Sequence, residues 1–137
     1  MEQVEERRPF YTAGGVVIHG RGIGKPAGIP TANLSIDEAP DLPEPGVYIS
    51  QVIIKGETFC GVTHIGARPT VDRRREPSFE THILDFDRDI YGEFIRVLLY
   101  ARIRPPKKFP DLPSLAEQIK RDGDAARAYF GHPSEAR

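Results

Sequence analysis

The sequence is poor in cysteine, in net charge and in long apolar runs, and each shortage excludes some classes of protein. Cys60 is the only cysteine of the 137 residues, which excludes an intrachain disulfide and favours the reducing cytoplasm. The 19 Lys and Arg residues nearly balance 20 Asp and Glu residues, and a net charge of −1 argues against a protein that mainly neutralises nucleic acid or an anionic membrane. No apolar run is long enough to span a bilayer or to form the core of a signal peptide.

Helical periodicity is also missing from about the first hundred residues, which argues against the parallel folds that need a helix between strands. Thirteen Gly and thirteen Pro residues instead separate short runs rich in β-branched and aromatic side chains. These runs predict strands over residues 13–19, 46–54, 57–65, 78–86 and 93–103. Only Lys55 and Gly56 separate the second run from the third, and this spacing predicts a hairpin with a two-residue turn.

Helical spacing begins only near the end of the chain. Apolar residues recur at that spacing between residues 112 and 129 and predict one amphipathic helix there. Asp111 is the expected N-cap, and Ser114 with Glu117 offers a capping box as an alternative start. Gly123 weakens the helix interior and could split it. Five or six short strands followed by one helix predict a small antiparallel barrel or sandwich with the helix packed on it.

A glycine-rich segment after the first predicted strand is a candidate for contact with phosphate. Its members are Gly20, Gly22, Gly24, Lys25 and Gly28. Backbone N–H groups freed of side-chain bulk can curl around an anion, and the Lys adds a mobile positive charge. The spacing matches neither a Walker A loop nor a dinucleotide-binding fingerprint, so the alternative is a plain turn.

The residues that follow this segment strengthen the phosphate interpretation. Pro30 fixes the backbone, and Thr31 and Asn33 stand two residues apart, so their side chains share one face in a strand. A hydroxyl and a carboxamide oxygen are hard ligands suited to Mg²⁺, which keeps waters and phosphate oxygens as its other ligands. The alternative is a Thr–Asn pair that satisfies a turn.

Glu80 is the candidate general base. It shares a strand face with His82, and a carboxylate held on a rigid strand could accept a proton from a substrate hydroxyl. The alternative is a Glu that faces solvent. We interpret His82 and His64 as structural rather than as zinc ligands, because no Cys or His partner lies at zinc spacing. The basic run at residues 73–75 is most simply a solvated loop.

Taken in order, these motifs resemble those of the riboflavin kinase (flavokinase) family, which includes stand-alone enzymes and the C-terminal module of bifunctional FAD synthetases. The resemblance runs over residues 10–129, nearly the whole chain, and rests on short segments at 15–17, 20–28, 30–33, 46–48, 65–70, 80–83, 91–92, 104–109 and 115–122. It implies a mainly β fold, a six-stranded antiparallel Greek-key barrel with a C-terminal helix. That domain would occupy residues 11–130, between a flexible lead-in at 1–10 and a flexible tail at 131–137.

The resemblance also implies an activity, transfer of the ATP γ-phosphate to the 5′-hydroxyl of riboflavin to give FMN and ADP. Thr31 and Asn33 would bind Mg²⁺ and the ATP phosphates, and Glu80 would be the catalytic base with Asn33 beside it. Pro30 and the glycine segment with Lys25 would complete the ATP site.

The flavin side of the site would comprise Arg104, Lys107 and Phe109, close to the C-terminal helix. Pro106 stands where a Glu is common in the family. We expect a cytoplasmic monomer, or part of a bifunctional FAD synthetase, that binds neither nucleic acid nor membrane. Two other functions fit such a barrel: a flavin-binding sensor without kinase chemistry and a nucleic-acid-binding module. The candidate metal and base residues argue against the first, and the balanced charge argues against the second.

Overall fold

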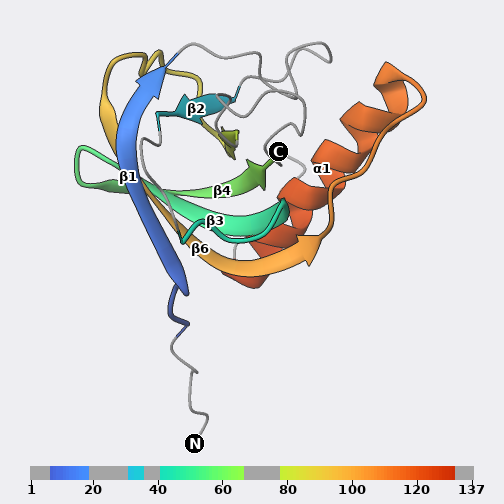
Figure 1. The fold of residues 1–137 in the computed structure, drawn as a ribbon. Helices are drawn as coiled ribbons and strands as arrows, with labels where there is room; N and C mark the ends of the chain where they lie inside the picture. The colour runs from blue at the N-terminus through green and yellow to red at the C-terminus, as the bar shows by residue number, and fades with distance from the viewer. Residues whose placement is uncertain (1–6, 19–30, 36–40, 67–77, 132–137) are drawn as a thin grey trace, which may run out of the picture.

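The computed structural model describes residues 7–18, 31–35, 41–66 and 78–131, and in these ranges it contains six strands and one helix. The elements are β1 (Tyr11–Ile18), β2 (Ala32–Leu34), β3 (Gly46–Ile54), β4 (Glu57–Ile65), β5 (Phe79–Ile83), β6 (Phe94–Arg104) and α1 (Leu112–Tyr129). The strands close into a barrel in the order β1-β2-β5-β4-β3-β6, and all six pairings are antiparallel (Figure 1). Because β6 returns beside β3 after the meander β3-β4-β5, the topology is a Greek key. The predicted barrel with a C-terminal helix is confirmed.

The turns show which local predictions were accurate. Lys55 and Gly56 have φ angles of 48° and 84°, the left-handed pair that a type I′ hairpin requires, and the ladder pairs Ile54 with Glu57 around them. The strand predicted over residues 78–86 is shorter, because β5 ends at Ile83 and the chain turns at Asp85, whose φ is 56°. Asp tolerates that left-handed conformation better than most residues.

The barrel interior is filled by alternate residues of the strands. On β5, for example, Phe79 and Ile83 point inward and are almost fully buried. The core cluster consists of these inward residues and Ile90 from the connection between β5 and β6: Ala13, Val17, Ala32, Leu34, Tyr48, Val52, Ile54, Ile65, Phe79, Ile83, Ile90, Ile95, Val97 and Leu99. This cluster leaves the outward residues of the same strands available for other contacts.

Helix α1 covers the outer face of β3 and β4, as Figure 1 shows on one side of the barrel. Asp111 is its N-cap, as predicted: the Ser114 backbone N–H donates to Asp111 Oδ1 at 2.8 Å. Hydrogen bonding from the side chain of Ser114, and then from its backbone, lowers the pKa of the Asp111 carboxyl. The helix is continuous through Gly123. A Cβ there would lie 3.3 Å from Leu84 Cδ2, so the glycine lets the helix approach the turn after β5 closely.

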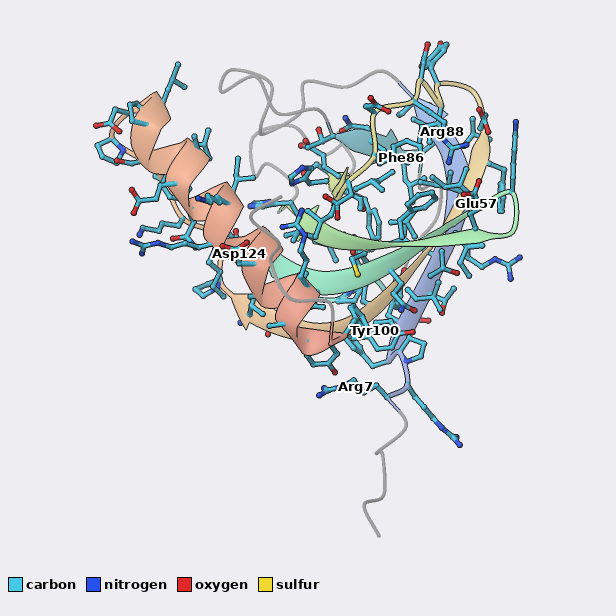
Figure 2. The ribbon with its side chains drawn as sticks, turned by 180° about the vertical axis from the view of Figure 1, so that it is seen from behind. Arg7, Glu57, Phe86, Arg88, Tyr100 and Asp124 are labelled. Atoms are coloured by element: carbon cyan, nitrogen blue, oxygen red, sulfur yellow. The ribbon has the colours of Figure 1, made fainter. Side chains whose placement is uncertain are left out.

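The two ends of the described chain meet below the barrel. The Phe10 N–H donates to the Leu99 carbonyl at 2.9 Å, and the Arg7 guanidinium lies 3.9 Å from the centroid of the Tyr129 ring. Figure 2 shows Arg7 and Tyr100 near the last turn of α1, where Tyr100 packs edge-on against Phe130. Among the described residues, no helix is long and apolar enough to cross a membrane.

Candidate functional site

The candidate base lies on the outer wall of the barrel. The inward side of β5 is fixed by hydroxyls: Thr63 donates to Ser50 at 2.9 Å, and Thr63 and Thr81 lie 2.8 Å apart. All three residues are fully buried, so a slip of one residue would break two hydrogen bonds in a place that water does not reach. Glu80, next to Thr81 along the strand, therefore points outward.

Strand β2 brings the two candidate metal ligands to this carboxylate. The Thr31 hydroxyl donates to Glu80 Oε1 at 3.1 Å, although 49 residues separate the two in sequence. Asn33 stands directly opposite Glu80 in the antiparallel pairing of β2 and β5. The three residues that the sequence singled out separately thus gather at one point, and each contributes an oxygen atom.

Strand β4 extends the same wall. In its pairing with β5, His64 stands opposite Glu80 and Val62 stands opposite His82. Because alternate residues share a face, these four side chains occupy the corners of a rectangle on the outside of the barrel. Glu80 has an imidazole as its neighbour along each edge, and Val62 lies at the far corner.

This wall and helix α1 line a pocket that is partly open to solvent. The helix contributes Leu115, Ile119 and Asp122, which share one helical face. The lining residues are Thr31, Val62, His64, Glu80, His82, Arg104, Leu115, Ile119 and Asp122. The pocket therefore combines an apolar side with polar groups that converge on Glu80, which is typical of a small-molecule site.

Arg104 ties the end of β6 to the helix beside the pocket. Its guanidinium donates to both carboxylate oxygens of Asp122, at 2.9 and 3.3 Å, and Gln118 donates to the same carboxylate at 2.9 Å. The Phe109 ring lies 5.7 Å from the Arg104 guanidinium carbon and 5.4 Å from Lys107 Nζ. Arg104, Lys107 and Phe109, the predicted flavin-side residues, therefore lie together, and Arg104 lines the pocket.

The two imidazoles of the wall are held in the neutral form. Burial lowers the pKa of His64, and the Arg104 guanidinium lowers it further, while Asp122 opposes the shift. Burial also lowers the pKa of His82, with Arg127 adding to the effect and Asp85 opposing it.

The same two side chains each carry an unsatisfied atom. Within the described residues, His64 Nε2 and His82 Nδ1 are buried without a hydrogen-bond partner. A buried polar atom left unpaired costs about 1–3 kcal/mol, so these two atoms need an explanation that the barrel itself does not supply.

The donor set near Glu80 fits Mg²⁺. Thr31 and Asn33 offer neutral oxygen atoms beside the Glu80 carboxylate: Thr31 Oγ1 lies 3.1 Å from Glu80 Oε1, and Asn33 stands opposite Glu80 in the pairing of β2 with β5. In the part of the chain that the structure describes, no group of three or more His, Cys, Asp or Glu side chains could hold a metal ion. The fit thus depends on hard oxygen ligands, of which Mg²⁺ needs only a few from protein when phosphate supplies the others.

Some predicted site residues lie outside the described residues: Gly20, Gly22, Gly24, Lys25, Gly28 and Pro30. The basic run 73–75, predicted to be a solvated loop, also lies outside them. Sequence reasoning missed the roles of His64, Asp122 and Val62 in lining the pocket. Asp122 carried a usable signal, since it follows Leu115 and Ile119 at helical spacing on an apolar face. His64 carried none, because its position opposite Glu80 depends on the pairing of two strands.

Three comparisons place the chain among known proteins. The model of the family described as "Flavokinase: Riboflavin kinase" matches residues 7–130. The chain is 38% identical over 127 residues to a bifunctional riboflavin kinase/FMN adenylyltransferase of Bacillus subtilis, and 42% identical over 124 residues to that of Escherichia coli K12. These matches cover 91% and 90% of the chain but only 40% and 39% of the relatives, so the chain spans about two fifths of their length.

Solved structures show the same fold. A riboflavin kinase from Trypanosoma brucei matches with a TM-score of 0.62 at 23% identity, over 89% of this chain and 80% of that one. A Streptococcus pneumoniae structure described as a macrolide-efflux protein matches with a TM-score of 0.77 at 36% identity, over 87% of this chain and 38% of that one. That description belongs to the longer protein, of which this chain matches 38%.

Proposed function

The chain belongs to the riboflavin kinase family, and on this premise we propose that it transfers the γ-phosphate of ATP to the 5′-hydroxyl of riboflavin, with FMN and ADP as products. The observation that carries the proposal is that Thr31 and Glu80 are hydrogen-bonded in the wall of a pocket between barrel and helix, with Asn33 opposite Glu80 in the neighbouring strand. FMN adenylylation, named for the longer relatives, is not assigned to this chain. The cytoplasmic location, the monomeric state and the absence of nucleic-acid binding stay predictions from the sequence.

The pocket can hold an amphipathic substrate in one orientation. Val62, Leu115 and Ile119 offer an apolar surface to a flat aromatic ring, while Glu80 lies at the polar end, where a terminal hydroxyl would be placed. The barrel wall is rigid because its register is fixed by the buried hydroxyls of Thr63 and Thr81. Such fixed placement of the acceptor hydroxyl is the main requirement of phosphoryl transfer.

Glu80 is the group that accepts the proton in this proposal. As the 5′-oxygen of riboflavin bonds to the γ-phosphorus, its proton passes to the Glu80 carboxylate, and the bond between the γ-phosphorus and the bridging oxygen of ADP breaks. The Thr31 hydroxyl donates to Glu80 Oε1, so it fixes the orientation of the carboxylate.

Thr31 and Asn33 would hold Mg²⁺ with the ATP phosphates. When bound, the ion supplies positive charge that neutralises the phosphate oxygens during transfer. The glycine segment with Lys25 and the flavin-side residues Arg104, Lys107 and Phe109 keep their predicted roles in this proposal. The ion pair of Arg104 with Asp122 supports the last group, because it fixes the guanidinium at the edge of the pocket.

The direct test is to incubate the protein with riboflavin, ATP and Mg²⁺ and to separate the flavins by chromatography. We expect FMN and ADP in equal amounts. Absence of FMN would overturn the proposed activity; quenching of riboflavin fluorescence without ADP would then favour a flavin sensor, and salt-sensitive retention of RNA on a filter would favour a nucleic-acid-binding module.

Replacement of the base tests the mechanism. Glu80→Gln keeps the size and one hydrogen-bonding oxygen but cannot accept the proton, so kcat should fall by about 10²- to 10⁴-fold with flavin affinity changed by less than about threefold. Glu57→Gln is the matched control, because Glu57 pairs with Arg88 at 3.4 Å on the part of the barrel away from the helix (Figure 2). An unchanged rate in Glu80→Gln would refute the assignment of the base.

A further inference from the structure

The wall of the pocket carries two groups that the proposed chemistry does not use, the imidazoles of His64 and His82. Both line the pocket, and each has a buried nitrogen without a hydrogen-bond partner among the described residues. Native proteins rarely leave such atoms unpaired, so each one needs an explanation, and in a binding site a polar group of the bound ligand is one.

Their arrangement relative to Glu80 restricts what that partner can be. His64 faces Glu80 across the β4–β5 ladder, which places their Cβ atoms about 4.5–5.5 Å apart, and His82 follows Glu80 along β5 at about 6.6 Å. The two imidazoles occupy opposite corners of the rectangle. A flexible chain that begins at Glu80 and leads toward Val62 and the helix therefore passes between them.

The chemistry of neutral imidazole matches a row of hydroxyl groups. Its two nitrogens are one donor and one acceptor, and a hydroxyl can serve either. Burial lowers the pKa of both side chains and keeps them neutral, so each retains an acceptor nitrogen. The torsion that turns a His ring is broad, so a small rotation presents the enclosed nitrogen to the pocket.

We propose that His64 and His82 hydrogen-bond the secondary hydroxyls of the ribityl chain and thereby select a polyhydroxylated chain over a saturated one. The inference rests on the proposed kinase activity, which puts the 5′-hydroxyl at Glu80 and the ring against Val62 and the helix. In this arrangement the two histidines are specificity-determining residues, whereas Glu80 remains the base.

The test compares riboflavin with a flavin that has a 5-hydroxypentyl chain, which keeps the ring and the reacting hydroxyl but lacks the three secondary hydroxyls. Affinity is measured by quenching of flavin fluorescence without ATP, and kcat/KM is measured for both flavins. Each hydrogen bond should contribute about fivefold to tenfold, so the unmodified protein should prefer riboflavin by at least about 25-fold.

In His64→Leu and His82→Leu, affinity for riboflavin should fall about fivefold to tenfold, while affinity for the hydroxypentyl flavin should change by less than about twofold. His64→Gln, which keeps a donor and an acceptor, should restore much of the preference and shows that a loss in the Leu variant is not caused by misfolding. Val62→Ala is the matched control on the same wall. It should weaken both flavins equally, because it removes only apolar contact.

The outcomes separate this inference from the proposed function. If riboflavin binds but no FMN forms with ATP and Mg²⁺, the proposed activity fails, while the affinity ratio still reports on the two histidines. If FMN forms and the Leu variants weaken both flavins equally, the activity stands and the histidine inference is overturned. An unmodified protein that binds both flavins with the same affinity overturns it as well.

Discussion

The two faces of strand β5 have opposite character. Phe79, Thr81 and Ile83 point into the barrel, where every polar group on this strand has a partner, and Phe79 is 1% exposed. Glu80 and His82 point outward into a pocket that contains buried nitrogen atoms without partners in the described part of the chain. Side chains adjacent in sequence thus serve different purposes: those of the inner face stabilise the barrel, and those of the outer face line the pocket proposed to bind the substrate.

This separation follows from the geometry of a strand. Because successive side chains alternate, a barrel can fill its interior with apolar residues and still present an independent set of side chains outside. The outer set is polar where α1 leaves a pocket, and apolar where α1 packs directly, as at Val47 and Ile49. Substitutions on the inner face should therefore mainly lower the free energy of unfolding, and substitutions on the outer face should mainly change substrate affinity and reaction rate.

The largest expected effect is on the inner face. Phe79→Ala removes a fully buried ring and should lower the free energy of unfolding by about 3–5 kcal/mol, measured by urea denaturation. Phe94→Ala on the exposed side of β6, where the ring is 59% exposed, should cost less than about 1 kcal/mol. Equal losses in the two variants would show that the interior does not dominate stability.

A smaller effect is expected at the contact between barrel and helix. Asp122→Ala leaves the Arg104 guanidinium without its carboxylate; breaking a buried pair costs about 3–5 kcal/mol, and the 16% exposure of Arg104 should reduce this to about 2 kcal/mol. The flavin KM should rise as well, because Arg104 loses its orientation. Asp124→Ala on the same helix is the control, since its pair with Arg127 is longer, at 3.5 Å, and more exposed than the Arg104–Asp122 pair, and it should contribute less than about 1 kcal/mol. A similar loss of stability in both variants would contradict the importance of the buried pair.

The smallest expected effect is the pH dependence of stability, which we attribute to two histidines on the outer face. The folded-state pKa values of His64 and His82 lie below the ordinary value of 6.5, so the unfolded chain binds more protons as the pH falls through that value. Their contribution to stability is therefore complete above pH 6.5 and is lost as the pH falls below it. Asp111, whose pKa lies below 3.8, does not contribute in this range.

Urea midpoints at about pH 7.5 and about pH 5.5 measure this dependence. The midpoint should be lower at the acidic value, and the difference should shrink in the double variant His64→Leu/His82→Leu. A pH dependence that is identical in the double variant would show that other groups cause it.

Much of the fold could be predicted because its causes are local. The alternation of apolar residues indicated five of the strands, the Lys55-Gly56 spacing indicated the hairpin, and Asp111 marked the start of the helix. The prediction was wrong where a local pattern continued past a turn. Leu84 and Phe86 continue the apolar run after Ile83, but Asp85 turns the chain there. Leu84 packs in the outer cluster with Ala126 of the helix, and Phe86 packs against the barrel core.

The candidate site was predictable only in part. Residue type and spacing were enough to select Thr31, Asn33 and Glu80, because the ability of a side chain to bind a metal ion or accept a proton depends on its own chemical groups. The partners of those residues were not predictable in the same way. His64 reaches the site through the β4–β5 pairing, and Asp122 reaches it through an ion pair with Arg104 from another element.

By itself, the sequence determined five of the six described strands, the helix and the two faces onto which their side chains alternate, since alternation and helical periodicity depend on neighbours along the chain. Only the tertiary structure decided which faces meet: the order β1-β2-β5-β4-β3-β6 sets Thr31 beside Glu80, and the packing of α1 turns an outer wall into a pocket. The physical reason is that pairing between distant strands is fixed by how the whole barrel closes and fills its interior, which no single segment encodes.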